Sequence, residues 1–322
     1  MFYFVEMAIN HTKRGLEARG RASKSNCAGR FETHERDVFD DGWEISEAIV
    51  QLRTEVSVER PRRVITRNTS PDVSFDRSIN PYRGCEHGCI YCFARPTHAF
   101  LGLSPGLDFE SRLIARPDAS EVLERELRAK SYRPAVIAIG TNTDPYQPIE
   151  REYRIMRRIL EVLRDYRHPV AVVTKGALIE RDIDILGQMG RDGLARVGVS
   201  ITTLDSEVSR RMEPRVPSPV RRMKTIERLA QAGCPVHVMV SPVVPALTDH
   251  EMEAILKQAA EAGAIAASWI MLRLPREVSP LFREWAEEHF PDRARRIMGR
   301  VRDLHGGQEY DADWGKRMTG EG

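Results

Sequence analysis

Three of the chain's five cysteines lie close together in the segment GCEHGCIYCFARP, residues 84–96. Three residues separate Cys85 from Cys89, and two separate Cys89 from Cys92. Thiolates are the usual ligands of iron–sulfur centres, and this spacing can wrap one loop around a cubic cluster. Three cysteines leave one iron without a protein ligand, which is a place where chemistry can occur. The spacing therefore predicts a [4Fe-4S] cluster bound by Cys85, Cys89 and Cys92.

A structural zinc site is the alternative for the same loop. Zinc in a closed site takes four ligands, usually from two pairs of residues, and the second pair is missing here. The fourth ligand could come from His87 or His98 nearby, or from Cys27 or Cys234 elsewhere in the chain. Cys234 falls between a helix end and a strand start, which places it on the opposite rim of an α/β fold. The cluster is therefore favoured, and zinc stays open.

The elements that must position this loop follow a repeating strand–helix pattern. Apolar runs typical of buried parallel strands occur at residues 78–82, 134–140, 168–176, 195–202, 234–242 and 266–275. Stretches with apolar residues at helical spacing follow them at residues 119–130, 149–166, 179–190, 218–233 and 249–263. Right-handed crossovers wind such strands into one sheet, and six units are too few for a closed eight-stranded barrel. We predict an α/β fold, a partial (β/α)6 barrel of the TIM type.

Three regions follow from this pattern. Residues 1–66 lack sustained periodicity and predict an N-terminal arm that is partly irregular. Residues 67–278 would form the partial barrel. Residues 279–322 begin with two helical stretches and end in a polar tail, so we expect a helical extension that covers one edge of the barrel.

Composition favours a cytoplasmic protein. The chain has 322 residues, of which 41% are hydrophobic and 30% charged, and its net charge is only +2. The odd number of cysteines favours a reducing compartment. A signal peptide is not expected, and no apolar run approaches the roughly 20 residues that span a bilayer. Basic clusters at 220–224 and 293–302 indicate solvated helix faces, with a phosphate-binding surface as the alternative.

Polar side chains follow the predicted strands where their carboxyl ends meet. Thr143 and Asp144 lie in the segment after the second strand, where hydroxyl and carboxylate groups could bind an ammonium group or form a turn. Lys175 follows the third strand, and Ser200 lies within the otherwise apolar fourth strand. Arg273 comes directly after the sixth, where it must find an anion. In such folds the chemistry collects at this rim, so these residues are candidates for a ligand site.

The sequence also resembles a known enzyme superfamily. A CxxxCxxC loop after the first strand of a six-fold βα barrel, with Tyr91 before the last cysteine, is similar to the radical S-adenosylmethionine superfamily. The segments SPDVSFDRSINPYRGCEHGCIYCFARPTH, GTNTDPYQPIE and VSPVVPALTD resemble its spore-photoproduct-lyase-like branch, in particular the uncharacterised bacterial proteins that share its core. The resemblance covers about residues 60–275 and extends more weakly to both ends.

The resemblance implies a mechanism and a set of roles. In the superfamily the open iron binds the amino and carboxylate groups of S-adenosylmethionine, which one electron then cleaves to a 5′-deoxyadenosyl radical. By this resemblance Thr143 and Asp144 would meet the cofactor's amino group, Lys175 its carboxylate, and Ser200 another part of it. Arg273 is a candidate from its position alone, and its anion could be a carboxylate of the protein or of the ligand. An electron donor such as flavodoxin or ferredoxin is implied. Nucleic acid is the favoured substrate class, with a peptide or small metabolite open, as is the oligomeric state.

The sequence departs from the lyases at one position. Those enzymes place a hydrogen-donor cysteine at the end of the second strand, where this chain has Thr141. A threonine has no S–H hydrogen to give, so repair of thymine photoproducts does not follow from the resemblance. A protein that uses its cluster only for electron transfer or regulation is the alternative, but it would not need polar groups at three strand ends around the open iron.

Overall fold

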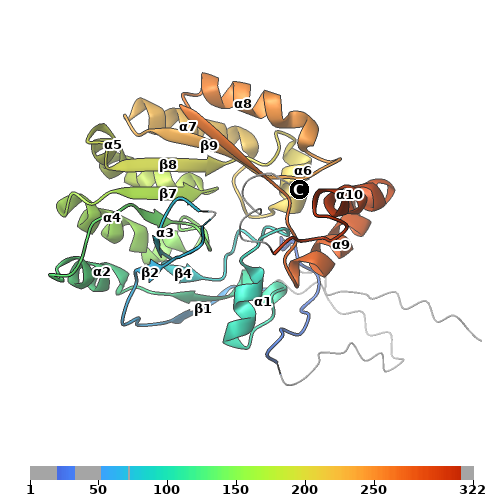
Figure 1. The fold of residues 1–322 in the computed structure, drawn as a ribbon, viewed down its shortest axis with the longest axis horizontal. Helices are drawn as coiled ribbons and strands as arrows, with labels where there is room; N and C mark the ends of the chain where they lie inside the picture. Colours follow the sequence, from blue (N-terminus) through green and yellow to red (C-terminus); the bar gives the residue numbers. More distant parts are fainter. Residues whose placement is uncertain (1–19, 33–51, 72, 313–322) are drawn as a thin grey trace, which may run out of the picture.

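A seven-stranded sheet forms the centre of the computed structural model, which describes residues 20–32, 52–71 and 73–312 (Figure 1). In spatial order its strands are β10 (Ala266–Met271), β9 (Val236–Val243), β8 (Ala195–Ser200), β7 (Val170–Thr174), β6 (Ile137–Ile139), β3 (Arg77–Ile79) and β2 (Thr66–Arg67). The six strands from β10 to β3 run parallel, and only the edge strand β2 is antiparallel. No pairing between β10 and β2 closes the described sheet. The predicted partial barrel is confirmed.

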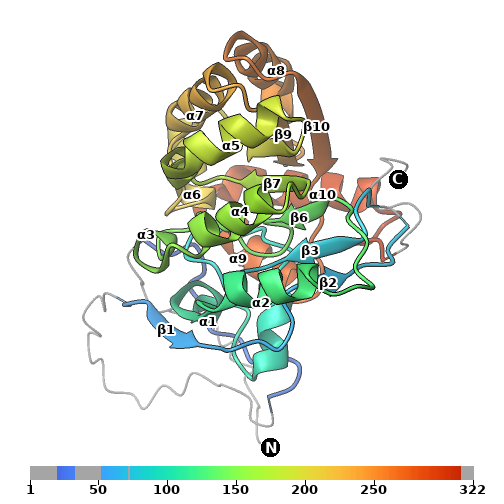
Figure 2. The same ribbon diagram turned by 90° about the vertical axis from the view of Figure 1, so that its left-hand side faces the viewer.

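Helices cover the outer side of this sheet, because each brings an apolar stripe to it. In Figure 2 they follow one another in an arc: α8 (Met252–Glu261), α7 (Pro219–Gln231), α5 (Ile183–Arg191), α4 (Ile155–Asp165) and α2 (Ala119–Leu127). Ile159 and Leu163 of α4 are fully buried against strand residues such as Val172. The start of α7 is fixed by Ser218, whose hydroxyl accepts a hydrogen bond from the Arg221 amide.

Short helical segments connect the larger elements. They are α3 (Glu150–Tyr153), η2 (Ala177–Asp182), α6 (Ser206–Met212) and η3 (Asp249–Glu251). The sequence pattern did not predict α6, which begins after Asp205, whose carboxylate accepts hydrogen bonds from the Glu207 and Val208 amides. The candidate residues lie in or next to the loops at the carboxyl ends of the strands, and these short segments connect most of those loops to the larger helices.

A second, three-stranded sheet carries the cysteine loop. It consists of β1 (Glu55–Val58), β5 (Arg112–Ala115) and β4 (Tyr82–Arg83), with β1 parallel and β4 antiparallel to β5. The cysteine loop follows β4 directly, and then come η1 (Arg95–Leu101) and α1 (Leu107–Ser111). These elements are short, so they carry no sustained periodicity by which the sequence pattern could indicate them.

The C-terminal helices α9 (Val278–His289) and α10 (Pro291–Leu304), red in Figure 1, lie on the side of the sheet opposite to α2, α4 and α5, and α9 contacts α6. Their buried side chains, including Trp285 and Ile297, form a second hydrophobic core together with Ile90 and Tyr91 of the cysteine loop. The predicted extension is therefore helical, and it packs directly against the cysteine loop.

Part of the predicted arm also reaches the cysteine loop. Within the described segment 20–32, Arg21 donates a hydrogen bond to the Glu110 carbonyl, and Asn26 exchanges hydrogen bonds with Asp108. Residues 1–19 and 33–51 of the arm lie outside the described residues. The domain boundaries stay a prediction. Among the helices that the structure describes, none is long and apolar enough to cross a membrane.

Candidate cluster site

The cysteine loop turns tightly, and its three thiols are free. Within it the Gly88 amide donates to the Cys85 carbonyl at 3.2 Å, and the Cys92 amide donates to the Cys89 carbonyl at 3.2 Å. Gly88 has a φ of +66°, and a Cβ there would lie 2.6 Å from a carboxylate oxygen of Glu110. A side chain at this position would therefore be strained and crowded. Glycine at position 88 thus lets the backbone of the loop pass close to this carboxylate.

Arg95 holds the loop from the inside. Its side chain is fully buried, and it donates hydrogen bonds to the carbonyls of Gly88 and Cys89 at 2.9 and 3.0 Å. It also reaches the carbonyls of two residues that precede α1 and pairs with Glu110 at 2.5 Å. A guanidinium has five N–H donors in a rigid fork, so one side chain can fix two turns of the loop against its neighbours.

Burial favours the protonated form of the three thiols. Burial raises the pKa of Cys85 and Cys92, and it raises the pKa of Cys89 to about 12 although the nearby Lys175 ammonium opposes this. Iron replaces the thiol proton on binding, and thiolates are its usual ligands in clusters. Across the described ranges, no group of three or more His, Cys, Asp or Glu side chains could hold a single metal ion. A cubic cluster does not need such convergence, because each thiolate binds a different iron.

Three of the four candidate fourth ligands for zinc lie beside other groups. His87 Nδ1 lies 3.2 Å from Asp144 Oδ2, and His98 Nε2 lies 2.9 Å from the Arg112 carbonyl. Cys234 is buried at the start of β9, where its sulfur lies 3.9 Å from the Pro235 carbonyl. The donor set around the loop therefore consists of three soft thiolates, which fits a three-cysteine cluster with an open iron.

Asp144 links two strand ends to the cysteine loop. Its carboxylate accepts hydrogen bonds from the Thr174 hydroxyl at 2.6 Å and from the backbone amides of Lys175 and Tyr146 at 2.7 and 2.9 Å. Burial disfavours its charge, but His87 and these donors outweigh burial and lower the pKa of Asp144 to about 2. The ionised carboxylate thus holds the loop after β6 against the end of β7.

Thr143 and Gln147 hold the cysteine loop and the strand β4 that precedes it. The Thr143 hydroxyl is buried and donates to the Tyr82 carbonyl at 2.9 Å. Gln147 donates to the Gly84 carbonyl at 3.2 Å and accepts from the Glu86 amide at 2.9 Å, so its amide bridges the first turn of the cysteine loop. Sequence reasoning missed Gln147, although it lies only three residues after Asp144 in the quoted segment GTNTDPYQPIE.

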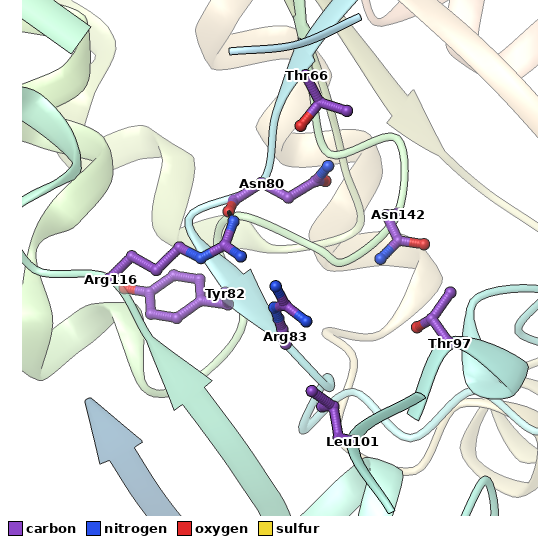
Figure 3. A pocket seen from close by; sticks show the side chains of 8 residues that line it. All are labelled: Thr66, Asn80, Tyr82, Arg83, Thr97, Leu101, Arg116 and Asn142. Atoms are coloured by element: carbon purple, nitrogen blue, oxygen red, sulfur yellow. Dashed lines mark hydrogen bonds between the residues drawn. The ribbon is translucent and has the colours of Figure 1, made fainter. Parts of the chain in front are cut away.

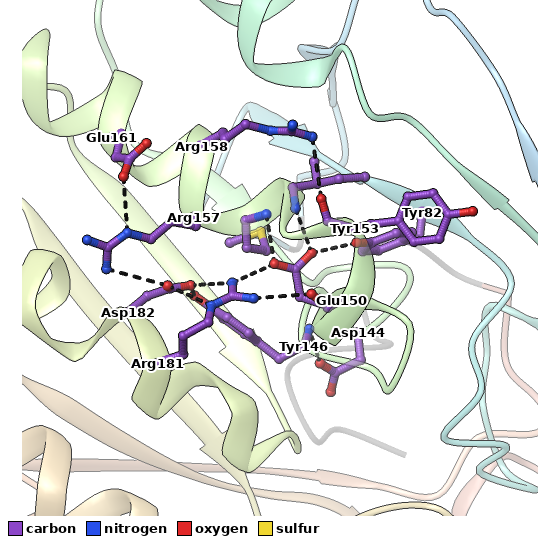
Figure 4. Close-up of polar contacts among 12 residues, drawn as sticks. Tyr82, Asp144, Tyr146, Glu150, Tyr153, Arg157, Arg158, Glu161, Arg181 and Asp182 are labelled. Carbon is purple, nitrogen blue, oxygen red and sulfur yellow. Dashed lines mark hydrogen bonds and ion pairs between the residues drawn. The ribbon is translucent and has the colours of Figure 1, made fainter.

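A buried ionic network lies beneath this segment (Figure 4). Glu150 accepts hydrogen bonds from the Tyr82 hydroxyl at 2.5 Å and from Arg181 at 2.6 Å. Arg181 also pairs with Asp182, which accepts from the Tyr146 hydroxyl at 3.1 Å. Burial raises the pKa of Glu150, while Arg181 and Tyr82 favour its charge. The network thus fixes Tyr82 of β4 and Tyr146, which lies within the segment from Thr143 to Gln147.

Lys175 faces the cysteine loop. Its ammonium lies 5.7 Å from the centre of the Tyr91 ring, and no hydrogen bond joins it to another described residue. Burial opposes its charge, but the neighbouring Cys89, Glu213 and Asp144 raise its pKa. Lys175 is therefore a cation in a largely desolvated place beside the three thiols, where an anionic group of a ligand would be its natural partner.

Glu213, directly after α6, is another residue that sequence reasoning missed. It accepts hydrogen bonds from the Tyr91 hydroxyl, from Arg222 at 2.8 Å and from Thr202 at 3.1 Å, and it is fully buried. Arg222 also donates to the Ser200 carbonyl at 2.9 Å. Glu213 thus ties the aromatic residue of the cysteine loop to the end of β8.

The structure places the five predicted cofactor-binding residues at the carboxyl ends of four strands. Thr143, Asp144, Lys175 and Ser200 follow or end β6, β7 and β8, and the contacts above connect these strand ends to the cysteine loop. Arg273 lies two residues past β10 and is half-buried between Leu272 and Leu274, which belong to the second core.

Comparison with known proteins identifies the family. Residues 79–259 match the family model of the radical SAM superfamily. The chain belongs to this superfamily. Its members use a [4Fe-4S] cluster and S-adenosylmethionine, so both predicted cofactors are confirmed.

The related proteins are uncharacterised and therefore do not indicate a substrate. Uncharacterised proteins of Mycobacterium tuberculosis and Mycobacterium bovis are 37% identical over 233 residues, which is 72% of this chain and 67% of theirs. An uncharacterised protein of Methanocaldococcus jannaschii is 26% identical over 174 residues, 54% of this chain and 62% of its own.

Solved structures of spore photoproduct lyase share the fold of this chain. One cysteine-to-serine mutant of that enzyme aligns with a TM-score of 0.54 at 17% identity, over 73% of this chain and 66% of that one. A double mutant of the lyase, which has bound AdoMet and dinucleoside spore photoproduct, aligns with the same score at 16% identity and the same coverage. The chain thus spans about two thirds of these lyase structures, and the similarity shows the fold alone.

Proposed function

We propose that this radical SAM protein is an enzyme that cleaves S-adenosylmethionine reductively and removes a hydrogen atom from a substrate. The observation that supports this most is the cysteine loop, whose three thiols are held by groups that are not themselves ligands. When bound, the cluster and the cofactor supply an electron and a 5′-deoxyadenosyl radical that abstracts hydrogen. The protein residues orient the ligands and exclude water.

The candidate residues divide into two kinds of role. Lys175 is a charged group facing the loop, and we assign it to the cofactor's carboxylate. Thr143 is hydrogen-bonded to the Tyr82 carbonyl, and Asp144 is hydrogen-bonded to Thr174 and the Lys175 amide. They would therefore act on the cofactor mainly by shaping the segment that meets its amino group. We retain Ser200 and Arg273 as further contacts.

Nucleic acid is the proposed substrate class, with a flavodoxin or ferredoxin as electron donor. The support is the shared fold with a lyase that is described with a dinucleoside photoproduct bound. Thr141 cannot give the S–H hydrogen that the lyases use, so the final hydrogen-transfer step would differ from theirs. A cluster that serves only electron transfer or regulation is the competing function, and it predicts that S-adenosylmethionine has no effect on the cluster.

The test is anaerobic reconstitution with S-adenosylmethionine and a strong reductant, followed by measurement of 5′-deoxyadenosine with and without irradiated DNA. We expect 5′-deoxyadenosine, stimulation by the DNA, and a change in the EPR signal of the reduced cluster when S-adenosylmethionine is added. The Cys89→Ala variant should lose the cluster and all product. Cys234→Ala is the matched control, because that buried thiol lies at the other end of the sheet. An unchanged EPR signal would favour the non-catalytic cluster protein.

A further inference from the structure

The two basic clusters of the sequence differ in their surroundings. In the cluster at 220–224, Arg222 is buried against Glu213, and Arg221 pairs with Glu180. The cluster at 293–302 lies on α10, where Arg295 and Arg296 are exposed on an open surface. Neither cluster combines unpaired positive charge with an enclosed surface, so neither forms an enclosed pocket for an anion.

A polar pocket of about 170 Å³ lies next to the cysteine loop. It is partly open to solvent, and Figure 3 shows its lining: Thr66, Asn80, Tyr82, Arg83, Thr97, Leu101, Arg116 and Asn142. At about 30 Å³ for each water, it has room for five or six water molecules. That is below the usual volume of a pocket for a drug-sized molecule, and it suits one small polar group of a larger ligand.

Two arginines give the pocket a positive charge. The Arg116 guanidinium is only 13% exposed, and it donates to Glu59 at 3.0 Å and to the Asn80 carbonyl at 3.1 Å. Arg83 is 40% exposed and lies 3.3 Å from the same Glu59 carboxylate. One carboxylate thus serves two guanidinium groups, and a positive charge remains. Figure 3 shows both guanidinium groups on the same side of the pocket.

Neutral polar groups complete the lining. The Asn80 Oδ1 atom is buried and has no hydrogen-bond partner, which costs about 1–3 kcal/mol unless a ligand or water supplies one. An amide can present its carbonyl or its NH2 group on rotation, so Asn80 can adapt to either kind of ligand atom. Asn142 and Thr97 face the arginines from the other side of the pocket (Figure 3).

Several residues that line the pocket are close in sequence to the cysteine loop or to the segment that supports it. Arg83 ends β4 and is separated from Cys85 by one residue, and Thr97 lies on η1, five residues after Cys92. Asn142 precedes Thr143 in the segment that supports the cysteine loop. A ligand group held by these residues would therefore contact the same segments that carry and support the cysteine loop.

We propose that this pocket binds a phosphate ester of the substrate, with Arg83 and Arg116 as its cationic contacts. Planar guanidinium groups match phosphate oxygens bidentately, and amide and hydroxyl donors complete such sites. The assignment of this phosphate to a substrate rests on the proposed function, but binding itself does not. In a nucleic acid the phosphate is a backbone diester, and in a metabolite it is a terminal monoester.

Calorimetric titration of the cluster-reconstituted protein tests the site, without S-adenosylmethionine or reductant. The probes are the dinucleotide dTpdT, its uncharged methylphosphonate analogue and ribose 5-phosphate. Arg83→Gln should weaken binding of the phosphate probes about tenfold, because charged hydrogen bonds are lost. Arg83→Lys keeps the charge but not the fork, so it should weaken binding less. Arg295→Gln on α10 is the matched control for loss of one surface charge, and thermal unfolding checks the fold of each variant.

The outcomes separate the possibilities. Tighter binding of dTpdT than of ribose 5-phosphate, together with loss on methylphosphonate substitution, would assign the site to nucleic acid, and the reverse order would assign it to a phosphorylated metabolite. Unchanged binding in Arg83→Gln, or an equal loss in Arg295→Gln, would overturn the phosphate site. Because no turnover is needed, failure of 5′-deoxyadenosine formation would overturn the proposed function and leave this result standing.

Discussion

Replacement of Arg95 tests whether the cysteine loop is held by residues other than its ligands. In Arg95→Met, Glu110 would keep a charge in a fully buried place without its counter-charge. Removing one partner of a buried ion pair costs about 3–5 kcal/mol. The carbonyls of Gly88 and Cys89 would also lose their donors. Against a total stability of about 5–15 kcal/mol for a typical domain, the variant should be strongly destabilised.

Arg95→Lys separates the charge from the geometry. A lysine keeps a cation near Glu110, but its three donors cannot replace the five hydrogen bonds of the guanidinium. Each acceptor that loses its donor costs about 1–3 kcal/mol, so this variant should fold but bind the cluster less well. The assays are iron and sulfide content after anaerobic reconstitution, visible absorption of the cluster, and chemical unfolding.

Arg128→Met is the matched control for Arg95. Arg128 is 68% exposed and pairs with Glu124 on the surface of the protein, where an ion pair contributes about 1 kcal/mol or less. Its loss should leave cluster content unchanged. If both Arg95 variants bind the cluster and unfold like Arg128→Met, the loop is not held by Arg95, and the reasoning from its five contacts fails.

Three further predictions concern the surrounding framework. Glu213→Gln should lower the free energy of unfolding by about 1.5–3 kcal/mol, because Arg222 and Tyr91 lose a charged acceptor, as chemical unfolding would show. Gly140→Ala should destabilise strongly, since φ is +90° and the new Cβ would lie 2.0 Å from a backbone oxygen, whereas Gly102→Ala, with φ +67° and open space, should cost only about 1–2 kcal/mol. Thermal unfolding distinguishes them. Arginines lower the pKa of Glu180, although burial opposes this. The stability that the Glu180 carboxylate contributes should therefore be present at neutral pH and be lost as the pH falls through its lowered pKa. Glu180→Gln should then unfold like the wild type in acid, but at a lower temperature than the wild type at neutral pH.

The parallel sheet could be predicted from the sequence because its strands are continuous apolar runs. In runs such as VAVVT in β7 and VHVMV in β9, alternate residues are buried and the residues between them are partly buried. The small sheet could not be predicted in the same way. Its strand β4 has two residues, and β1 is largely exposed, so both depend on pairing with β5 and carry no periodic pattern of their own.

The three cysteines are proposed as cluster ligands because their residue type and spacing are rare, whereas the charged residues that hold their loop carry no such signal in the sequence. Glu213 lies 122 positions after Tyr91, its hydrogen-bond partner, and it stands in a run of charges that resembles a solvated helix. A buried tyrosine hydroxyl needs a partner, but the sequence does not say which residue supplies it. The same holds for Arg95 and Glu110, whose burial follows only from the complete fold.

The shape of the loop is therefore set by groups that do not bind the cluster. Arg95, Gln147 and Glu213 contact the loop through its carbonyls, an amide and the Tyr91 hydroxyl, so the thiols are gathered before any iron is present. Burial keeps those thiols protonated in the metal-free protein, and cluster insertion must displace their protons. The loop is already ordered when the protein folds, so ordering it adds little to the cost of cluster binding. The iron–thiolate bonds then have to offset only the free-energy cost of removing the thiol protons. Since the supporting residues donate no ligand, a cluster bound by the three cysteines would keep one iron open.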